Sequence, residues 1–306
     1  MAVFTTEDAK VLLPHDVADG MIAEARSTST VAQLSAREPQ RFGNTDIIVF
    51  NDFPKAEFVD EGAQKGATKG GFSMVTAKPR KAQVTMRFNE EVQWADEDHQ
   101  KGILRELAGA GQVALSRALD LGLYHRINPL TGTEITGWDN YLTATTNVVE
   151  TDAGDADAQL RAAVGLLMQA DTSWGVNGQA LDPRMAWALS ELTTKDGTQR
   201  YPSLGYGANI AGFNGIPAAQ GNTVSGTPEA TDTGVRAIVG DFANGIRWGI
   251  QRDLPVEFIR FGDPDGQGDL KRHNQIALRL EIVFGWYVFA DRFAVVKAAA
   301  EDAEGN

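Results

Sequence analysis

The chain has 306 residues, a length that fits one large domain or two ordinary ones. Its 28 lysines and arginines against 41 aspartates and glutamates give a net charge of −13, which argues against a protein that wraps nucleic acid. The sequence has no cysteine, no uncharged apolar stretch of about eighteen residues and no signal-like start. These absences exclude disulfides, thiolate metal sites, membrane spans and a secretory signal.

The first part of the chain predicts an arm, a strand and a long hairpin. Residues 1–45 read as helical pieces joined by polar turns, and residues 47–50 predict a short strand. Residues 55–87 alternate apolar and polar on both sides of a glycine-rich tip at 62–71. This pattern predicts a hairpin with about sixteen residues per arm and a reach of roughly 50 Å. Such a ribbon has almost no core of its own, so it needs another surface to lie on.

Residues 96–124 give the clearest helix of the sequence. Asp96, Glu97 and Asp98 stand where acidic side chains favour a helix start, and apolar residues recur at helical spacing after them. A helix of this length spans about 44 Å. Two glycines near its middle, one of them Gly111, predict a bend or a close contact there.

The middle of the chain predicts two further helices and a loop-rich region. Asp182 is expected to cap a helix over residues 184–192, with Pro183 at its first position. Residues 203–234 are rich in Gly, Pro, Asn and Thr and predict turns with short strands. The other helix is expected over residues 155–170, with these side chains facing inward: Leu160, Val164, Leu167 and Met168.

The last third of the chain predicts β structure. Residues 276–285 alternate strictly between large apolar and other side chains, which predicts a strand with one buried face. Residues 289–295 form an apolar terminus before an acidic tail. Three further strands are expected at residues 235–239, 245–250 and 256–261.

No motif in the sequence carries catalytic chemistry. The four histidines are scattered without metal-ligand spacing, and no phosphate-binding glycine loop or nucleophile elbow occurs. Residues 263–269 resemble a calcium loop, but Gln267 and Asn274 stand where the fifth and twelfth ligands belong. A polar turn is therefore favoured over a metal-dependent enzyme built on this loop. The carboxylates at 90–91 and 96–98 read as charges around a helix start and not as an acid–base pair.

The order and spacing of these segments resemble the major capsid proteins of tailed bacteriophages, which have the Hong Kong ninety-seven fold. Leu13-Pro14 lies in a segment similar to the family's N-terminal arm, and residues 56–62 to its extended loop. Residues 84–91 lead into the long helix like the family's strand and spine helix. Residues 182–197 resemble its axial-domain helix, and residues 240–242 with the strands after them resemble its closing sheet.

The resemblance implies an α+β fold with four parts. The N-terminal arm would be residues 1–50, and the extended loop, a β-hairpin, would be 51–87. A peripheral domain with the spine helix would take 88–140 and 235–284, and an axial domain would take 141–234 and 285–306. The loop at 262–273 would project near a three-fold axis.

The implied function is a structural protein, not an enzyme, that self-assembles into the icosahedral head shell as hexamers and pentamers. The shell would enclose double-stranded DNA without sequence-specific binding, in a virion assembled in the host cytoplasm, with no cofactor, metal or membrane. A portal is a further expected partner, and a decoration protein is left open. Because the chain begins at the arm, we expect a scaffolding protein to be separate or absent. The alternative is an encapsulin-type compartment, which shares the fold but packages enzymes.

Charged side chains of the hairpin, the helix start and the acidic loop are the expected contacts between subunits. The hairpin carries a charge of +4 and would dock on the acidic segment 90–106 of a neighbour, or form a crosslink from a hairpin lysine to Asn274. The contact candidates are Lys65, Lys69, Lys78, Arg80, Lys81, Glu90, Glu91, Asp96, Glu97, Asp98, Asp263, Asp265 and Asp269.

Overall fold

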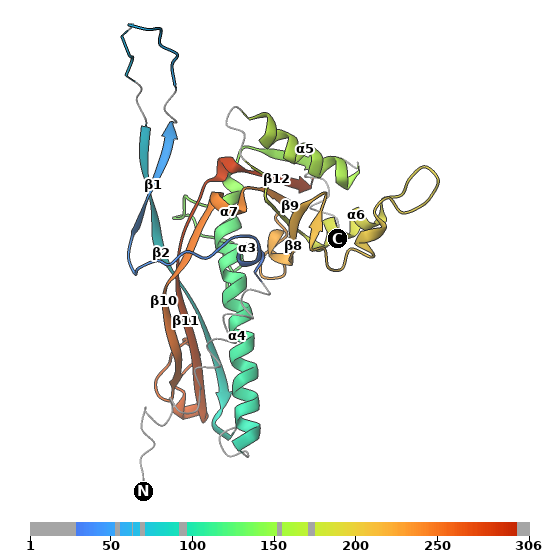
Figure 1. Cartoon of the computed structure of the whole chain (residues 1–306). Helices are drawn as coiled ribbons and strands as arrows, with labels where there is room; N and C mark the ends of the chain where they lie inside the picture. The colour runs from blue at the N-terminus through green and yellow to red at the C-terminus, as the bar shows by residue number, and fades with distance from the viewer. Residues whose placement is uncertain are drawn as a thin grey trace.

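The computed structural model describes residues 29–52, 56–62, 64–67, 71–91, 97–151, 155–170 and 175–298. A long sheet runs beside a long helix, and a second sheet with two helices lies to one side (Figure 1). A two-stranded ribbon projects beyond the end of the long sheet (Figure 1). The helical pieces predicted within residues 1–28 lie outside the described residues.

The long sheet is antiparallel throughout, with the strand order β1-β2-β11-β10. The predicted strand β11 is confirmed, and Ile276, Leu278 and Leu280 are buried on one face as expected. The other face is not exposed throughout, because Ala277 and Val283 are buried as well. The strands are β1 (Thr45–Asp52), β2 (Gly71–Asn89), β10 (Ile246–Ile259) and β11 (Gln275–Val288).

Strand β2 changes its partners along its length. Its inner part pairs with β11 from Lys78 opposite Trp286 to Asn89 opposite Gln275. Its outer part pairs with β1 from Ala77 to Gly71. The ribbon proper is therefore this outer part, about seven residues or roughly 23 Å long.

The structure corrects the predicted hairpin in two ways. Its first arm is β1 at residues 45–52, and residues 56–62 are not in a strand. Its return arm is only partly a ribbon, because Val84, Met86 and Phe88 pack against the core of the long sheet. The sixteen-residue arms without a core were wrong because alternation shows which faces a strand has, not which strand it pairs with.

Helix α4 (Glu97–His125) confirms the predicted long helix to within one residue at each end. It lies along the long sheet, where Leu115 packs with Leu278 and Leu280. A Cβ atom on Gly111 would come within 2.9 Å of a Leu280 methyl, so this glycine lets helix and sheet approach closely. The close contact expected at this position is thus present.

The second sheet has the strand order β5-β12-β9-β6-β8-β7 and is mixed parallel and antiparallel. Helices α5 (Ala156–Gln169) and α6 (Pro183–Glu191) cover one face, and their buried side chains form one cluster with that face. The strands are β5 (Val148–Thr151), β6 (Gly178–Leu181), β7 (Gly212–Phe213), β8 (Ile216–Gln220), β9 (Val235–Gly240) and β12 (Phe293–Ala298).

The other face of the second sheet packs against α4 and the short helix α3 (Thr30–Leu34). Ile238 and Val295 of this sheet share one core with Leu123 of α4 and Trp286 of the long sheet. The two sheets are therefore parts of one continuous core. The remaining elements are β3 (Ile127–Asn128), β4 (Thr133–Glu134), α7 (Phe242–Gly245) and the 3-10 turns η2 (Leu142–Ala144), η3 (Pro202–Leu204), η4 (Asn222–Val224), η5 (Lys271–His273) and η6 (Ala290–Arg292).

Two short connections side by side join the sheets, one from β9 to β10 and one from β11 to β12. The Phe289 N–H donates to the Gly245 carbonyl at 2.9 Å, and the Asp241 N–H donates to the Arg292 carbonyl at 3.3 Å. A Cβ on Gly240 would lie 2.5 Å from the Arg292 carbonyl oxygen, so only glycine fits. These contacts fix the joint between the sheets.

Several other predicted elements are confirmed and two details were wrong. Asp182 caps α6 as expected, accepting from the Arg184 N–H at 2.9 Å. The strands expected at 245–250 and 256–261 are one strand, β10, with irregular register at two places. Met168 of α5 is 53% exposed and does not face inward.

A buried carboxylate on α4 fastens the start of the described chain. Asp120 is fully buried and accepts hydrogen bonds from Ser29 Oγ, from the Thr30 N–H and Oγ1 at 2.9 Å each, and from the Val31 N–H at 3.3 Å. Thr223 Oγ1 of η4 donates a further bond at 2.7 Å. Burial raises the pKa of Asp120, and these donors offset part of that rise. One side chain thus joins three distant segments.

We expect Asp120→Ala to destabilise the chain by about 2–4 kcal/mol, because two backbone N–H groups lose their buried acceptor. Asp120→Asn should fall between this variant and the wild type, since the amide keeps one accepting oxygen. Urea unfolding of the unassembled chain measures the difference, with the exposed Glu106→Ala on the same helix as the control. A loss no larger for Asp120→Ala than for Glu106→Ala would contradict the role of Asp120.

His125 at the end of α4 is buried and donates from Nε2 to the Val224 carbonyl at 2.9 Å. Burial lowers its pKa from the usual 6.5 to about 4. A histidine held neutral in the folded state gives stability that is complete above pH 6.5. That stability is lost as the pH falls from 6.5 towards 4, because only the unfolded chain takes up the proton.

Stability should therefore fall by about 3 kcal/mol between pH 7 and pH 4 through His125 alone. His125→Gln keeps an N–H for the Val224 carbonyl and cannot titrate, so its unfolding free energy should lack this part of the slope. Urea unfolding of both proteins across this range tests the expectation. Parallel pH profiles would show that another group is responsible.

Candidate functional site

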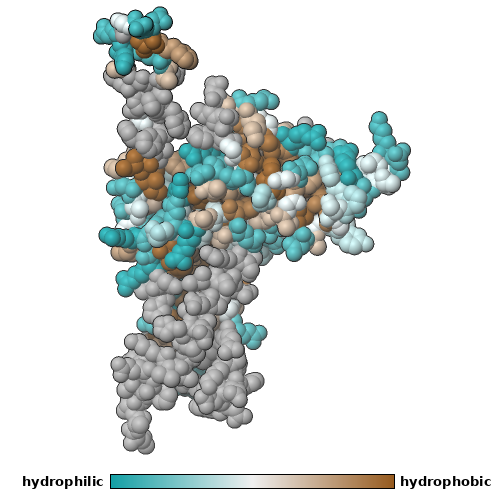
Figure 2. Space-filling model, in the orientation of Figure 1, coloured by the Kyte–Doolittle hydropathy of each residue, from teal (hydrophilic) through white to brown (hydrophobic). Residues whose placement is uncertain are grey.

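The ribbon carries large apolar side chains that the described chain leaves uncovered. Ile48 of β1 and Met74 of β2 lie directly opposite each other and are 67% and 66% exposed. Phe58, in the segment beyond the strands, is fully exposed. Figure 2 shows apolar surface at the far end of the ribbon. An exposed apolar pair on a two-stranded ribbon is typical of a surface that another molecule covers.

The cations at the root of the ribbon have different surroundings. Lys78 is exposed. Lys81 pairs with Glu281 of the neighbouring strand at 2.8 Å. Arg80 lies against the rings of Trp138 and Trp286. The predicted contact residues on β2 therefore do not act as one group.

Arg87 near the inner end of β2 holds the acidic loop between β10 and β11. Its Nε atom donates to both carboxylate oxygens of Asp265 at 2.8 and 2.7 Å. One terminal nitrogen donates to Asp263 Oδ1 and to the Gly268 carbonyl, each at 2.9 Å. These hydrogen bonds lower the pKa of the Asp265 carboxyl and raise that of Arg87. The loop is thereby fixed to the sheet.

This geometry bears on the calcium-loop alternative. The Arg87 guanidinium lies between Asp263 and Asp265 and bonds to a loop carbonyl, the kinds of ligand that would bind a cation. The third loop acid, Asp269, accepts from the Arg272 N–H at 3.1 Å. Within the described part of the chain, no group of three or more potential metal-ligating side chains is placed around one point. The loop is a turn between strands, organised by an arginine.

Arg87→Lys should loosen this loop, because an ammonium group cannot make the fork of bonds to both acids and the carbonyl. We expect faster amide hydrogen exchange at Gly268, whose N–H donates to Asp263 Oδ2 at 3.0 Å, with the strands unchanged. Arg260→Lys is the matched control, since Arg260 is exposed nearby. Equal exchange in the two variants would mean that the loop holds its shape without Arg87.

The structure shows the positions of some of the acidic residues predicted as contacts near the start of α4. Glu90 pairs with Lys271 at 2.9 Å within the same chain, and Glu91 is exposed. The backbone of Glu97 and Asp98 begins α4 as predicted. Two predicted contacts, Lys69 and Asp96, lie outside the described residues, and Lys65 is exposed near the far end of the ribbon.

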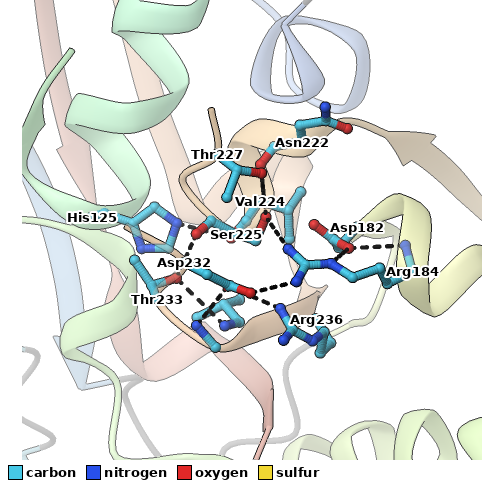
Figure 3. A network of polar contacts seen from close by, with 12 residues as sticks. His125, Asp182, Arg184, Asn222, Val224, Ser225, Thr227, Asp232, Thr233 and Arg236 are labelled. Carbon is cyan, nitrogen blue, oxygen red and sulfur yellow. Dashed lines mark hydrogen bonds and ion pairs between the residues drawn. The ribbon is translucent and has the colours of Figure 1, made fainter. Parts of the chain in front are cut away.

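A polar network at the second sheet holds the segment before β9, and Figure 3 shows it. Arg184 of α6 bonds to Asp182 at 3.1 Å and to Asp232. Asp232 also accepts from Arg236 and from the Gly234 N–H, each at 2.9 Å. Burial alone would raise the pKa of Asp232, but these bonds outweigh it and lower the pKa. The network joins helix α6 to strand β9.

Helix α4 contacts the same segment from the other side. Arg117 makes two bonds to the Glu229 carboxylate and donates to the Thr227 carbonyl at 2.8 Å. His125 reaches Val224 nearby (Figure 3). The segment from 224 to 234 is therefore tied to α4 and α6 together. Sequence reasoning missed this, since no local pattern marks partners about a hundred residues apart.

Exposed aromatic side chains form a further set that the sequence reasoning did not single out. Tyr206 and Phe261 are 84% and 72% exposed, and Trp187 of α6 is 49% exposed. All three lie in or next to turns or on a short helix. Phe261 could have been recognised from the sequence, because it is a large apolar residue directly before Gly and Asp in a predicted loop.

The comparisons with known proteins agree with this architecture. A family model described as the phage capsid family matches residues 9–298. A solved structure titled Mycobacterium phage Ogopogo is 42% identical, with a TM-score of 0.78 over 89% of this chain and 92% of that chain. One titled Gordonia phage Cozz is 30% identical, with a TM-score of 0.78 over 89% and 87%. No curated protein matches.

A more distant solved structure is the capsid of an empty GTA particle computed with C5 symmetry. It is 18% identical, with a TM-score of 0.61 over 90% of this chain and 91% of that chain, and it shares the fold. Among the described residues, no helix has the length and apolar character that a membrane span needs.

The family match covers nearly the whole chain, so the chain belongs to the phage capsid family, a structural family with the α+β Hong Kong ninety-seven fold. It is a major capsid protein that forms the head shell of a phage and resides in the virion capsid.

Proposed function

We propose that copies of this chain form hexamers and pentamers of a closed icosahedral head, and that the ribbon contacts a neighbouring copy. The observation that supports this is the exposed pair Ile48 and Met74 on a ribbon that extends beyond the core. Covering side chains of this size contributes about 1.5–3 kcal/mol each when burial is complete. Family membership supports self-assembly, which would repeat this contact at each subunit.

In this proposal, the ribbon binds a neighbouring copy mainly through apolar side chains and less through ion pairs. Two of the cations that gave the hairpin its positive charge, Lys81 and Arg87, already pair with acids of their own chain. Glu90 of the expected acidic partner segment pairs with Lys271. Exposed ion pairs contribute only about 0–1 kcal/mol in any case. Among the described cations of this segment, Lys65, Lys78 and Arg80 remain without an acid of their own chain, and these charges orient the ribbon in our proposal.

The head encloses double-stranded DNA without reading its sequence, in our proposal, and it is assembled in the host cytoplasm. The net charge of −13 supports this, because an acidic protein repels the phosphate backbone and lets DNA move along the wall. A portal is a further proposed partner, and the presence of a scaffolding protein and of a decoration protein is left open. The phage similarity favours this over an encapsulin-type compartment.

Expression of the chain alone in bacterial cytoplasm, followed by electron microscopy, tests the proposed shell. We expect closed particles with five- and six-fold capsomers. A chain that sediments as a compact monomer under all assembly conditions would contradict the proposal.

The double variant Ile48→Ser with Met74→Ser should raise the protein concentration needed for assembly by about tenfold, since it removes the apolar pair from the contact. Circular dichroism should not change, because neither side chain belongs to a core cluster of the described chain. Sedimentation velocity measures assembly. The matched control, Ile48→Val with Met74→Leu, keeps the apolar surface and should assemble normally. Normal assembly of the serine variant would show that the ribbon contact lies elsewhere.

A further inference from the structure

Arg80 at the root of the ribbon occupies a site built from two tryptophans. Its guanidinium carbon lies 3.9 Å from the ring centroid of Trp138 and 4.6 Å from that of Trp286. The two indoles meet edge to face, with centroids 5.4 Å apart. A Cβ on Gly122 of α4 would lie about 3 Å from both rings, so the pair packs tightly on the helix.

The walls of this site are held in place by the backbone. Asn140 exchanges two hydrogen bonds of 2.8 Å with the N–H and carbonyl of Val288, which ties the Trp138 loop to the end of β11. Trp286 is only 2% exposed. The position of the guanidinium is thus set by rigid elements, namely β2, β11 and α4.

Two nitrogen atoms of this site have no hydrogen-bond partner among the described residues, Arg80 Nε and Trp286 Nε1. Both are buried N–H donors, so the chemistry that would satisfy them is an acceptor. A buried donor without an acceptor costs about 1–3 kcal/mol. These two atoms lie beneath the surface of the subunit, whereas the Arg80 side chain as a whole is only partly buried. An acceptor that approaches from outside would therefore bind the terminal nitrogens of the guanidinium, for which the described residues supply no acceptor oxygen.

The described acids of the same subunit do not supply those oxygens. Asp139 acts on Arg80 only at a distance, and no ion pair or hydrogen bond joins the two within the described part of the chain. Burial lowers the pKa of Arg80 to about 10, with Asp139 a smaller opposing influence. Arg87, seven residues further along the same strand, contrasts with it, because two carboxylates of its own chain surround that guanidinium.

We propose that the site formed by Arg80, Trp138 and Trp286 binds a carboxylate side chain of a second copy of this chain. The carboxylate accepts from the guanidinium, which the indole rings hold in place. This inference rests on the head-shell function and adds to it one specific contact between subunits. A planar guanidinium held by aromatic rings is a well-organised receptor for a carboxylate.

The position of the site and the charge of the chain favour a second copy as the source. Arg80 lies three residues from Ala77, where β2 leaves the long sheet and becomes part of the projecting ribbon. Copies of the chain surround one another in a shell, and each carries 41 acidic residues against 28 basic ones. A neighbouring copy is therefore rich in carboxylates.

A zero-length crosslink identifies the carboxylate. Arg80→Lys puts an amine in the site, and a carbodiimide joins that amine to a carboxylate in direct contact. Particles assembled from equal amounts of ¹⁴N- and ¹⁵N-labelled variant chains are crosslinked and analysed by mass spectrometry. We expect a peptide of mixed isotope composition that joins Lys at position 80 to an aspartate or glutamate of another copy. A crosslink only within one chain, or none at position 80, would overturn the proposal while leaving shell formation intact.

Loss of the charge provides the second test. Arg80→Met keeps contact with the indoles through a flexible apolar side chain. We expect it to raise the concentration for assembly by at least about tenfold, as loss of a partly buried charge pair does, with the unfolding midpoint of the unassembled chain unchanged. Lys81→Met is the matched control, because it removes a neighbouring charge whose partner is in the same chain. Equal assembly of both variants, or a loss confined to stability, would overturn the proposal.

Discussion

The whole subunit depends on one strand, β2, that must satisfy its backbone hydrogen bonds with two different partners. Along Lys78 to Asn89 the partner is β11, and the pair lies under α4. Beyond Ala77 the only partner is β1, and neither a third strand nor a core continues among the described residues. A backbone that stays extended and paired is stiff, so the direction of the ribbon is fixed by the sheet from which it grows.

Helix α4 is the second element on which the arrangement depends, through polar contacts as much as apolar ones. Asp120 binds the segment before β1, Arg117 binds the segment before β9, and His125 binds η4. These contacts are made to the start of the short helix α3, to a loop and to a 3-10 turn. Apolar packing places the sheets against α4, whereas these directional bonds decide how the connecting segments run over it.

Regular elements could be predicted from the sequence wherever one periodic pattern is long enough. Helix α4 and strand β11 follow from spacing alone, and α6 follows from Asp182 and the proline after it. The ribbon could not be predicted correctly, because the alternation at 56–61 is as strand-like as the apolar run at 47–50, and strand pairing is not local. The overall α+β fold came from the order of the segments and their resemblance to a family.

The candidate site was harder to predict than the fold, because its contacts join residues that are far apart in the sequence. Arg87 and Asp265 are separated by 178 positions, and nothing near either residue indicates the other. Asp120 did leave a signal: an acid inside the apolar run from Leu119 to Leu123 is costly unless it has partners. A charged residue in such a run indicates a buried side chain that has hydrogen-bond partners, although the sequence does not show which residues donate to it.

The distribution of charge along β2 shows how one strand can serve both the fold and assembly. Lys81 and Arg87 meet acids of their own chain and so hold the sheet and the acidic loop together. Arg80, between them and the ribbon, meets indole rings and no acid among the described residues, and further out the surface is apolar at Met74. Along β2 towards the ribbon, the inner side chains have partners within the described subunit, whereas the outer ones have surfaces that this subunit does not cover. Removal of water stabilises the apolar pair, and a carboxylate partner offsets the cost of desolvating the half-buried cation. These positions can therefore strengthen a shell contact without adding to the stability of the free subunit.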